Sequence, residues 1–240
     1  MQQFTEGEVI QPKYTLEFDE RSIRMAFVRK VFAIVTIMFA VVAAMSSIGI
    51  ISSGFRHWVQ NNYWIYIVAL VVFIALSLVL SCFQSARRTF PLNIILLAIF
   101  TIAAGAMCMF ITAQYNVQSV LLTLLITTVC CAGVVVFAIF IKKDLTSYIG
   151  VAFILGMVLF VFGITAIIFT AVAGWKFLYS VYAGLAALLF MFYLMIDIQM
   201  LMGGRKFEIS PEEWVFASLQ IFLDIFNIFL LLLTLFGSRN

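Results

Sequence analysis

The stretch SLQIFLDIFNIFLLLLTLF, residues 218–236, decides the fold because it is long and apolar enough to span a membrane. It also carries an acid at its centre. Almost every side chain in it is a hydrocarbon, and about 20 such residues cross the apolar core of a bilayer as one helix. Asp224 lies in the middle, where insertion scales place the penalty for an aspartate at about 2.5 kcal/mol or more. An acid at such a position faces a bundle interior or a water-filled pathway rather than lipid. The stretch therefore predicts a buried transmembrane helix and Asp224 as a candidate functional residue.

The composition of the whole chain is that of an integral membrane protein. Its 240 residues are 65% hydrophobic and 10% charged, and the mean hydropathy is +1.17, whereas about a quarter of a soluble domain is charged. The net charge of +3 includes no basic run long enough to indicate nucleic-acid binding. All four cysteines lie inside apolar runs, which predicts packing roles rather than a disulfide framework, metal site or redox site: Cys82, Cys108, Cys130 and Cys131.

Seven apolar runs are long enough to cross a bilayer, which predicts an all-α membrane domain of seven helices in residues 27–240. The expected spans are residues 27–51, 63–83, 91–113, 118–141, 148–172, 177–202 and 213–236. Residues 1–26 are polar and predict a cytosolic tail; they contain no visible cleaved signal peptide, so the first span is expected to be an uncleaved anchor. The short connections leave no room for a soluble domain.

Basic residues near the span ends predict the orientation. Ten lie on one side: Arg21, Arg24, Arg29, Lys30, Arg87, Arg88, Lys142, Lys143, Arg205 and Lys206. Three lie on the other side: Arg56, Lys176 and Arg239. The N-terminus is therefore expected in the cytosol and the C-terminus on the opposite side, unless the last segment is re-entrant.

A second acid, Asp197, lies near the end of the sixth span, and the rise along a helix brings it to a depth similar to that of Asp224. At about 1.5 Å per residue, Asp197 lies roughly 9 Å below Gly203 and Asp224 roughly 15 Å below Trp214. Both depths fall in the cytosolic half of the membrane. The two side chains are therefore predicted to meet.

Two facing carboxylates make a proton-sensitive or cation-sensitive contact. At about 4 Å and an effective dielectric near 20 they repel by about 4 kcal/mol, so the pair is expected to hold one proton near neutral pH and to titrate as a unit. Exchange of that proton for a cation changes the charge at the helix contact. Calcium prefers six to eight oxygen ligands, so Asp197 and Asp224 predict transient passage of calcium rather than tight storage.

Other polar residues share one face of the last helix with Asp224, at separations of 7, 4, 3 and 7 residues: Glu213, Gln220, Asn227 and Thr234. One interpretation is a pathway lining, formed by Gln220, Asn227 and Glu213. The other is hydrogen bonding between helices, at about 0.6 kcal/mol per bond, which is favoured for Gln220, Asn227 and Thr234. Ser210 and Pro211 before two glutamates predict a helix-capping arrangement.

Three stretches resemble the transmembrane Bax-inhibitor-motif family, and in particular its Lifeguard branch. They are SPEEWVFASLQIFLDIFNIFLLLLT (210–234), GLAALLFMFYLMIDIQMLMGG (184–204) and IRMAFVRKVFAIVTIMF (23–39). The likeness extends from about residue 21 to the end and is most specific in the final third. It implies a seven-helix bundle with the last helix central, endomembrane residence, suppression of apoptosis and a pH-sensitive calcium leak controlled by an aspartate pair. Asp197 and Asp224 match that pair.

The resemblance also implies an arginine at the cytosolic end of the second helix that latches the aspartates. Arg87 and Arg88 lie in that neighbourhood, and their alternative role is ordinary charge anchoring at the membrane surface. Ile198 departs from the family pattern, in which a polar threonine commonly follows the first aspartate, so the hydrogen bonding around Asp197 is expected to differ.

The function predicted is a non-enzymatic calcium leak of the endoplasmic reticulum or Golgi membrane, rather than the plasma membrane, that suppresses apoptosis. Its expected partners are the lipid bilayer, calcium, protons and membrane proteins that regulate apoptosis, with no cofactor. The first alternative is a non-conducting regulator that acts through protein partners. A remote alternative is an intramembrane aspartyl protease, which the absence of a Gly-x-Gly-Asp motif around Asp224 argues against. A seven-helix receptor is disfavoured by the short loops and by the absence of an external cysteine pair.

Overall fold

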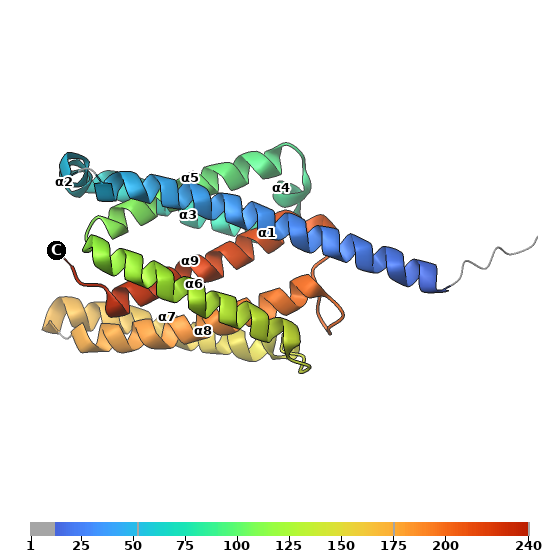
Figure 1. Ribbon diagram of the computed structural model, residues 1–240. Helices are drawn as coiled ribbons and strands as arrows, with labels where there is room; N and C mark the ends of the chain where they lie inside the picture. The colour runs from blue at the N-terminus through green and yellow to red at the C-terminus, as the bar shows by residue number, and fades with distance from the viewer. Residues whose placement is uncertain (1–12, 52, 175, 240) are drawn as a thin grey trace, which may run out of the picture.

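Nine α-helices and two short 3-10 helices make up the described part of the chain. The computed structural model describes residues 13–51, 53–174 and 176–239. Figure 1 shows the helices, which run as follows: α1 Lys13–Ile51, α2 Ser53–Asn61, α3 Tyr63–Cys82, α4 Gln84–Arg88, α5 Leu92–Thr112, α6 Val117–Phe140, η1 Thr146–Tyr148, α7 Ile149–Ala173, α8 Lys176–Met202, η2 Pro211–Glu213 and α9 Trp214–Phe236.

Seven helices of the described residues are long and apolar enough to span a membrane, which confirms the predicted fold class. They cover Glu20–Ile48, Tyr63–Cys82, Leu92–Thr112, Val117–Phe140, Thr146–Ala173, Phe177–Met202 and Pro211–Phe236. The protein is therefore a multi-pass membrane protein. Two short helices, α2 and α4, were not expected from the sequence, and α1 runs without a break through residue 26, where the polar tail was predicted to end.

The last helix is central in the bundle, as predicted. α9 packs against α1, α3 and α5 on one side and against α6 and α8 on the other, and Figure 1 shows it passing between these two groups. α7 packs on α8 at the outside. Because α9 contacts five of the other spanning helices, most of its length is enclosed by protein.

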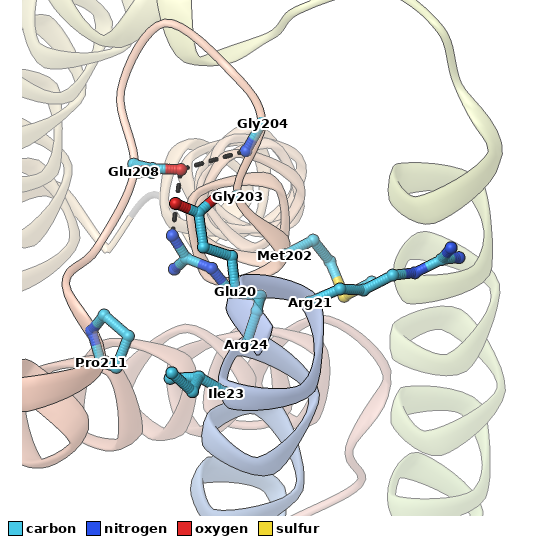
Figure 2. Close-up of a pocket in the computed structure, with 9 residues that line it drawn as sticks. All are labelled: Glu20, Arg21, Ile23, Arg24, Met202, Gly203, Gly204, Glu208 and Pro211. Atoms are coloured by element: carbon cyan, nitrogen blue, oxygen red, sulfur yellow. Dashed lines mark hydrogen bonds and ion pairs between the residues drawn. The ribbon is translucent and has the colours of Figure 1, made fainter. Parts of the chain in front are cut away.

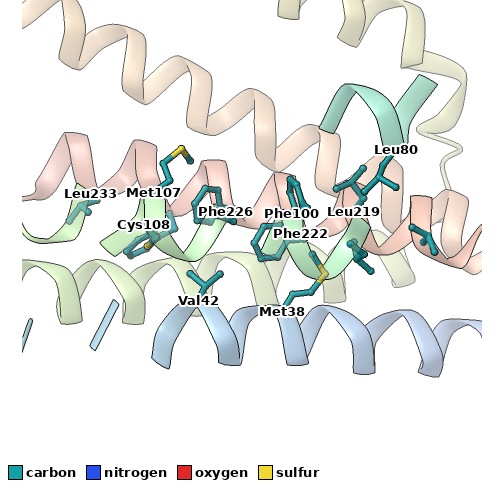
Figure 3. Packing of buried hydrophobic residues seen from close by; sticks show 14 of the residues in the cluster. Met38, Val42, Leu80, Phe100, Met107, Cys108, Leu219, Phe222, Phe226 and Leu233 are labelled. Atoms are coloured by element: carbon teal, nitrogen blue, oxygen red, sulfur yellow. The ribbon is translucent and has the colours of Figure 1, made fainter. Parts of the chain in front are cut away.

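Aromatic rings fix α9 against its neighbours on the α1, α3 and α5 side (Figure 3). Phe222 and Phe226 of α9 stack with ring centroids 5.4 Å apart, and Phe100 of α5 meets Phe222 edge to face at 5.6 Å. Phe73 of α3 stacks on Phe100 at 5.0 Å, and Phe39 of α1 lies 4.7 Å from Phe222. Close-packed rings with few rotamers hold a helix in one rotation about its axis. They therefore help to determine which way the polar residues of α9 point.

The outward faces of the bundle are apolar. Exposed residues on α3, α6 and α7 include Val71, Leu125, Phe153 and Ile154, and such continuous exposed hydrocarbon marks a surface covered by a membrane. All four cysteines are free, and Cys108 and Cys131 are buried in the core, the packing role expected of them.

Candidate functional site: a buried carboxyl pair and the Glu213 cluster

The structure brings Asp197 and Asp224 together in the bundle. Asp197 lies in the last third of α8 and Asp224 near the middle of α9, two helices that pack against each other. The residues are 7% and 6% exposed, and their carboxyl groups lie close enough to interact directly. Two carboxyl oxygens form a hydrogen bond only when one of them carries a proton. The two carboxyls are thus placed so that they could share one proton.

No described group forms a hydrogen bond with the buried Oδ2 of Asp224. Fully buried aliphatic residues pack around this region of α8 and α9, among them Ile198, Leu201, Ile221 and Ile228. A low-dielectric wall raises the free energy of any unpaired charge inside it. The free energy of the contact between α8 and α9 therefore depends on the charge of the carboxyl pair.

Ile198 itself is part of this wall. It is fully buried in the apolar cluster between α1, α6, α8 and α9, so the residue after Asp197 contributes packing and no hydrogen bond from its side chain. Tyr193 of α8 and Cys131 of α6 lie within electrostatic range of the carboxyls, and the Tyr193 hydroxyl donates to the carbonyl of Ala152 in α7 at 2.7 Å.

Asn227 and Thr234 bond within α9 rather than between helices as predicted. The Asn227 amide donates to the Leu223 carbonyl at 2.7 Å, and the Thr234 hydroxyl donates to the Leu230 carbonyl at 2.8 Å. Both bonds stay within α9, so the predicted interhelical hydrogen bonds are wrong for these two residues. The physical reason is that a short side chain reaches the carbonyl one turn back more easily than a neighbouring helix. Gln220 is half-buried on the same helix.

Glu213, Arg87 and Arg88 form a second polar site at the start of α9, which we call the Glu213 cluster. Oε2 of Glu213 pairs with Nε of Arg87, and Oε1 pairs with Nε of Arg88, each at 2.5 Å. The Arg87 guanidinium also lies 4.6 Å from the centre of the Phe216 ring and donates to the Ser81 carbonyl at 2.8 Å. The cluster ties α4 and the end of α3 to the beginning of α9.

The structure does not bring the Glu213 cluster to the aspartates. Glu213 precedes Asp224 by three helical turns, roughly 16 Å along the helix axis. The ion pairs of Arg87 and Arg88 run to Glu213, with an additional pair of 3.5 Å from Arg88 to Glu212. The sequence had suggested Arg87 or Arg88 as a latch on the aspartates and Glu213 as part of a pathway lining; in the structure the two arginines pair with Glu213 instead.

The capping arrangement predicted at Ser210 is correct only in part. Pro211 occupies the first turn of η2, as expected for a residue that lacks a backbone donor, but the Ser210 side chain makes no capping hydrogen bond. Glu213 turns toward the arginines instead of back toward Ser210. A charged hydrogen bond to arginine is stronger than a reciprocal cap.

Gln199, which sequence reasoning missed, anchors a loop beside the carboxyl pair. Its side chain is fully buried; Oε1 accepts from the Leu145 amide at 2.7 Å, and Nε2 donates to the Lys143 carbonyl at 3.0 Å and the Ala138 carbonyl at 3.4 Å. The sequence did contain a signal for this role: Gln199 is an amide in a spanning helix, two positions after Asp197. Polar residues in such helices seldom lack a partner, so a hydrogen bond from Gln199 could have been expected.

Two loops close the same end of α8. Arg205 donates to the carbonyls of Lys142 and Ile141, each at 2.7 Å, and Asp144 Oδ2 accepts from the Lys206 amide at 3.0 Å. Figure 2 shows a further contact, in which Glu208 accepts from the Gly204 amide and pairs with Arg24 of α1 at 3.0 Å. The end of α8 that carries Asp197 is thus held to both α1 and the α6–α7 connection.

A permanent metal centre is not formed by side chains in the described ranges. No group of three or more His, Cys, Asp or Glu residues in these ranges has the arrangement needed to hold an ion. The carboxyl pair alone supplies fewer oxygens than the six to eight that calcium prefers. What the site can do chemically is hold or release a proton, or exchange it for a cation.

The fold and the site together define a class of protein: a seven-helix membrane protein with a buried carboxyl pair on its last two helices.

Comparison with known proteins gives the family. The model of the family described as "Inhibitor of apoptosis-promoting Bax1" matches residues 24–240. The chain is 38% identical to protein lifeguard 3 of Homo sapiens over 224 residues, which are 93% of this chain and 72% of that relative. It is also 30% identical to protein lifeguard 4 of Mus musculus over 221 residues, 91% of this chain and 87% of the relative. The chain therefore belongs to the Bax-inhibitor-motif family, in its Lifeguard branch.

Proposed function

We propose that the protein is a pH-sensitive calcium leak of an endomembrane store and that it lowers sensitivity to apoptosis. The observation that carries the proposal is the burial of Asp197 and Asp224 next to each other between α8 and α9. Retaining two aspartates in spanning helices costs at least about 2.5 kcal/mol for each on insertion scales. A role in ion passage accounts for that penalty better than packing does.

The proton count of the pair sets the gate in this mechanism. With one or two protons, the carboxyls hydrogen-bond and hold α8 against α9. Without a proton, two like charges in contact repel by about 4 kcal/mol at an effective dielectric near 20, so the pair either separates or takes up a cation. Calcium and the proton compete for the same oxygens, and calcium passage is expected to rise as pH rises. Gln220 and Asn227 would add oxygens to the pathway once the helices move.

The Glu213 cluster supplies the latch in this proposal. Arg87 and Arg88 act on Glu213 rather than on the aspartates, and they hold α4 and the end of α3 against the start of α9. Glu213 is thereby assigned to the latch instead of the pathway lining. Movement of α3 away from α9 would first have to break two ion pairs.

The proposed orientation places the N-terminus in the cytosol, because ten basic residues lie at that end of the spans and three at the other. Calcium would then move from the store toward the side that carries the Glu213 cluster. The endoplasmic reticulum or Golgi membrane is the proposed location. A lower calcium content of the store would reduce the calcium released by a death signal, which links the leak to the family's description as an inhibitor of an apoptosis-promoting protein. No enzymatic step, cofactor or nucleic acid enters the mechanism.

The second candidate is a non-conducting regulator that acts through apoptosis-regulating membrane proteins. The apolar enclosure of the carboxyl pair and its small number of oxygens favour this candidate. In that case Asp197 and Asp224 serve only to fix α8 against α9. The two candidates differ in whether the purified protein moves calcium without a partner.

Flux into liposomes separates the candidates. The full-length protein is reconstituted in vesicles that contain a calcium-sensitive dye, and uptake is measured over a pH series. The leak predicts uptake that rises with pH, and Asp197→Asn and Asp224→Asn variants that lose this dependence. Glu20→Gln is the matched control, because that acid is exposed on α1 and lies outside both the carboxyl pair and the Glu213 cluster. Uptake equal to that of protein-free vesicles, or a pH dependence unchanged in both Asn variants, would overturn the proposal and leave the regulator.

A further inference from the structure

A groove between α1 and α5 opens on the membrane-facing side of the bundle, away from the carboxyl pair. Its volume is about 740 Å³, within the range of small-molecule sites. Its walls are aliphatic, with Ile37 and Val41 from α1 and Ile94 and Ile102 from α5. Three of these residues, Ile37, Ile94 and Ile102, are exposed at the surface. A hydrocarbon chain is the chemistry that such a groove accepts.

The groove has one polar end. Lys30, Phe90 and Trp214 line it at the side of the bundle where α9 begins. The Lys30 ammonium lies 3.9 Å from the centre of the Trp214 ring, and Lys30 remains exposed. Tryptophan and lysine at the end of an apolar surface are typical of the level of lipid headgroups. The groove therefore has the polarity of a phospholipid, with a charged end and an apolar length.

The positive charge of Lys30 is not neutralised by the carboxylates at this end of the groove. The neighbouring η2, just before α9, carries Glu212 and Glu213, and their ion pairs run to Arg87 and Arg88. Lys30 takes part in none of the ion pairs found within the described ranges. Three cations thus stand against two carboxylates, and the excess positive charge lies at the mouth of the groove.

The length of the groove matches one leaflet. Lys30 and Val41 are eleven residues apart on α1, a rise of roughly 16 Å. One leaflet of the hydrocarbon core is about 15 Å thick. An acyl chain whose headgroup lies at Lys30 would therefore reach the far end of the groove near the bilayer midplane.

We propose that the groove between α1 and α5 binds one acyl chain of an anionic phospholipid whose phosphate pairs with Lys30. The site selects by headgroup charge, which separates it from the unselective lipid contacts of the remaining surface. One juxtamembrane lysine at an anionic surface contributes about a fivefold preference. The proposal does not depend on calcium movement.

Quenching of Trp214 tests the site in the full-length protein. Trp58, Trp64 and Trp175 are replaced by phenylalanine, so that the remaining fluorescence comes from the mouth of the groove. The protein is reconstituted in phosphatidylcholine vesicles that contain a small fraction of lipid brominated near the headgroup end of the chain. We expect brominated phosphatidylglycerol to quench Trp214 at about a fivefold lower fraction than brominated phosphatidylcholine.

Four variants separate charge from shape. Lys30→Gln is expected to abolish the preference, whereas Lys30→Arg and the neighbouring exposed control Arg29→Gln retain it. Ala98→Phe places a ring in the groove at an exposed position and is expected to weaken quenching by both lipids. Each quenching curve is normalised to the variant's own unquenched emission, because Lys30→Gln also removes the contact with the Trp214 ring. Equal quenching by the two lipids, a preference that survives Lys30→Gln, or the same loss in Arg29→Gln would overturn the site.

Discussion

Arg87 pairs with Glu213 across 2.5 Å, and the two side chains are only 13% and 8% exposed. The pair joins α4, which follows α3, to η2, which leads directly into α9, the helix that carries Asp224. A buried ion pair adds little net stability over an apolar pair, but loss of one partner leaves an uncompensated charge. The geometry therefore makes Glu213 the charged anchor between α4 and the start of α9.

Glu213→Gln is predicted to destabilise the folded protein by about 3–5 kcal/mol, because it leaves the buried Arg87 without its counter-ion. Glu212→Gln is the matched control: its side chain is 74% exposed and forms a single 3.5 Å contact with Arg88, so its loss is expected to cost less than about 1 kcal/mol. Unfolding of both variants in the same detergent measures the difference. Equal stability of the two variants would show that Glu213 is not the anchor.

The sequence was sufficient for the fold because each spanning helix carries its own signal in length and hydropathy. The seven predicted spans agree with the structure within a few residues at almost every end, and Gly203 and Gly204 follow α8 as expected. The position of Asp197 near the depth of Asp224 followed from counting residues along two antiparallel helices. The beginning of α1 could not be predicted in the same way, because a helix that extends beyond the membrane can be polar.

The partners of the polar side chains could not be predicted from the sequence, because they depend on how each helix is rotated about its axis and on the path of the loops. Arg87 could be placed near the correct surface, but its choice of Glu213 depends on how α4 folds over the start of α9. Gln199 bonds to a loop that precedes it by more than 50 residues. Asn227 bonds to its own helix, which no spacing pattern distinguishes from a bond to a neighbour.

Gln199→Met is predicted to destabilise the α6–α7 connection by about 1–3 kcal/mol, because the buried Leu145 amide loses its acceptor. The change keeps the length of the side chain, so little volume is lost. Gln220→Met on α9 is the control, since Gln220 is only half-buried. Amide exchange at Leu145 reports the effect locally, and protection of this amide unchanged in Gln199→Met would refute the anchoring role.

Gly203→Ala is predicted to cost more stability than Gly204→Ala. Both residues have left-handed backbones, with φ of 74° and 72°, so each alanine carries a strain of about 1–2 kcal/mol. A methyl group on Gly203 would also meet the Arg24 guanidinium at 2.7–2.9 Å, whereas a methyl group on Gly204 meets nothing within 4 Å. Arg24 pairs with Glu208 and also donates to the Ile209 carbonyl at 2.6 Å. The difference between the two variants therefore measures displacement of Arg24 from these partners, and thermal unfolding should show it. A Gly204→Ala variant that is the less stable of the two would contradict this account.

The contact between the loops at the end of α8 is predicted to loosen in acid. Asp144 accepts from the Thr146 hydroxyl at 2.6 Å and amide at 2.9 Å, and from the Lys206 amide at 3.0 Å. The Thr146 hydroxyl, followed by the Lys206 amide, lowers the pKa of the Asp144 carboxyl below its ordinary value of 3.8. A carboxyl whose pKa is lower in the folded state contributes stability that is complete above the ordinary value and is lost as pH falls through the folded one. Amide protection factors at Thr146 and Lys206, each corrected for the intrinsic exchange rate, should therefore be constant above about pH 5 and fall toward pH 2.

The control variant Asp144→Asn removes the titrating group and should show lower protection that does not change over this pH range. Protection that falls equally in the Asn variant would assign the acid effect to another group and exclude Asp144 as its source.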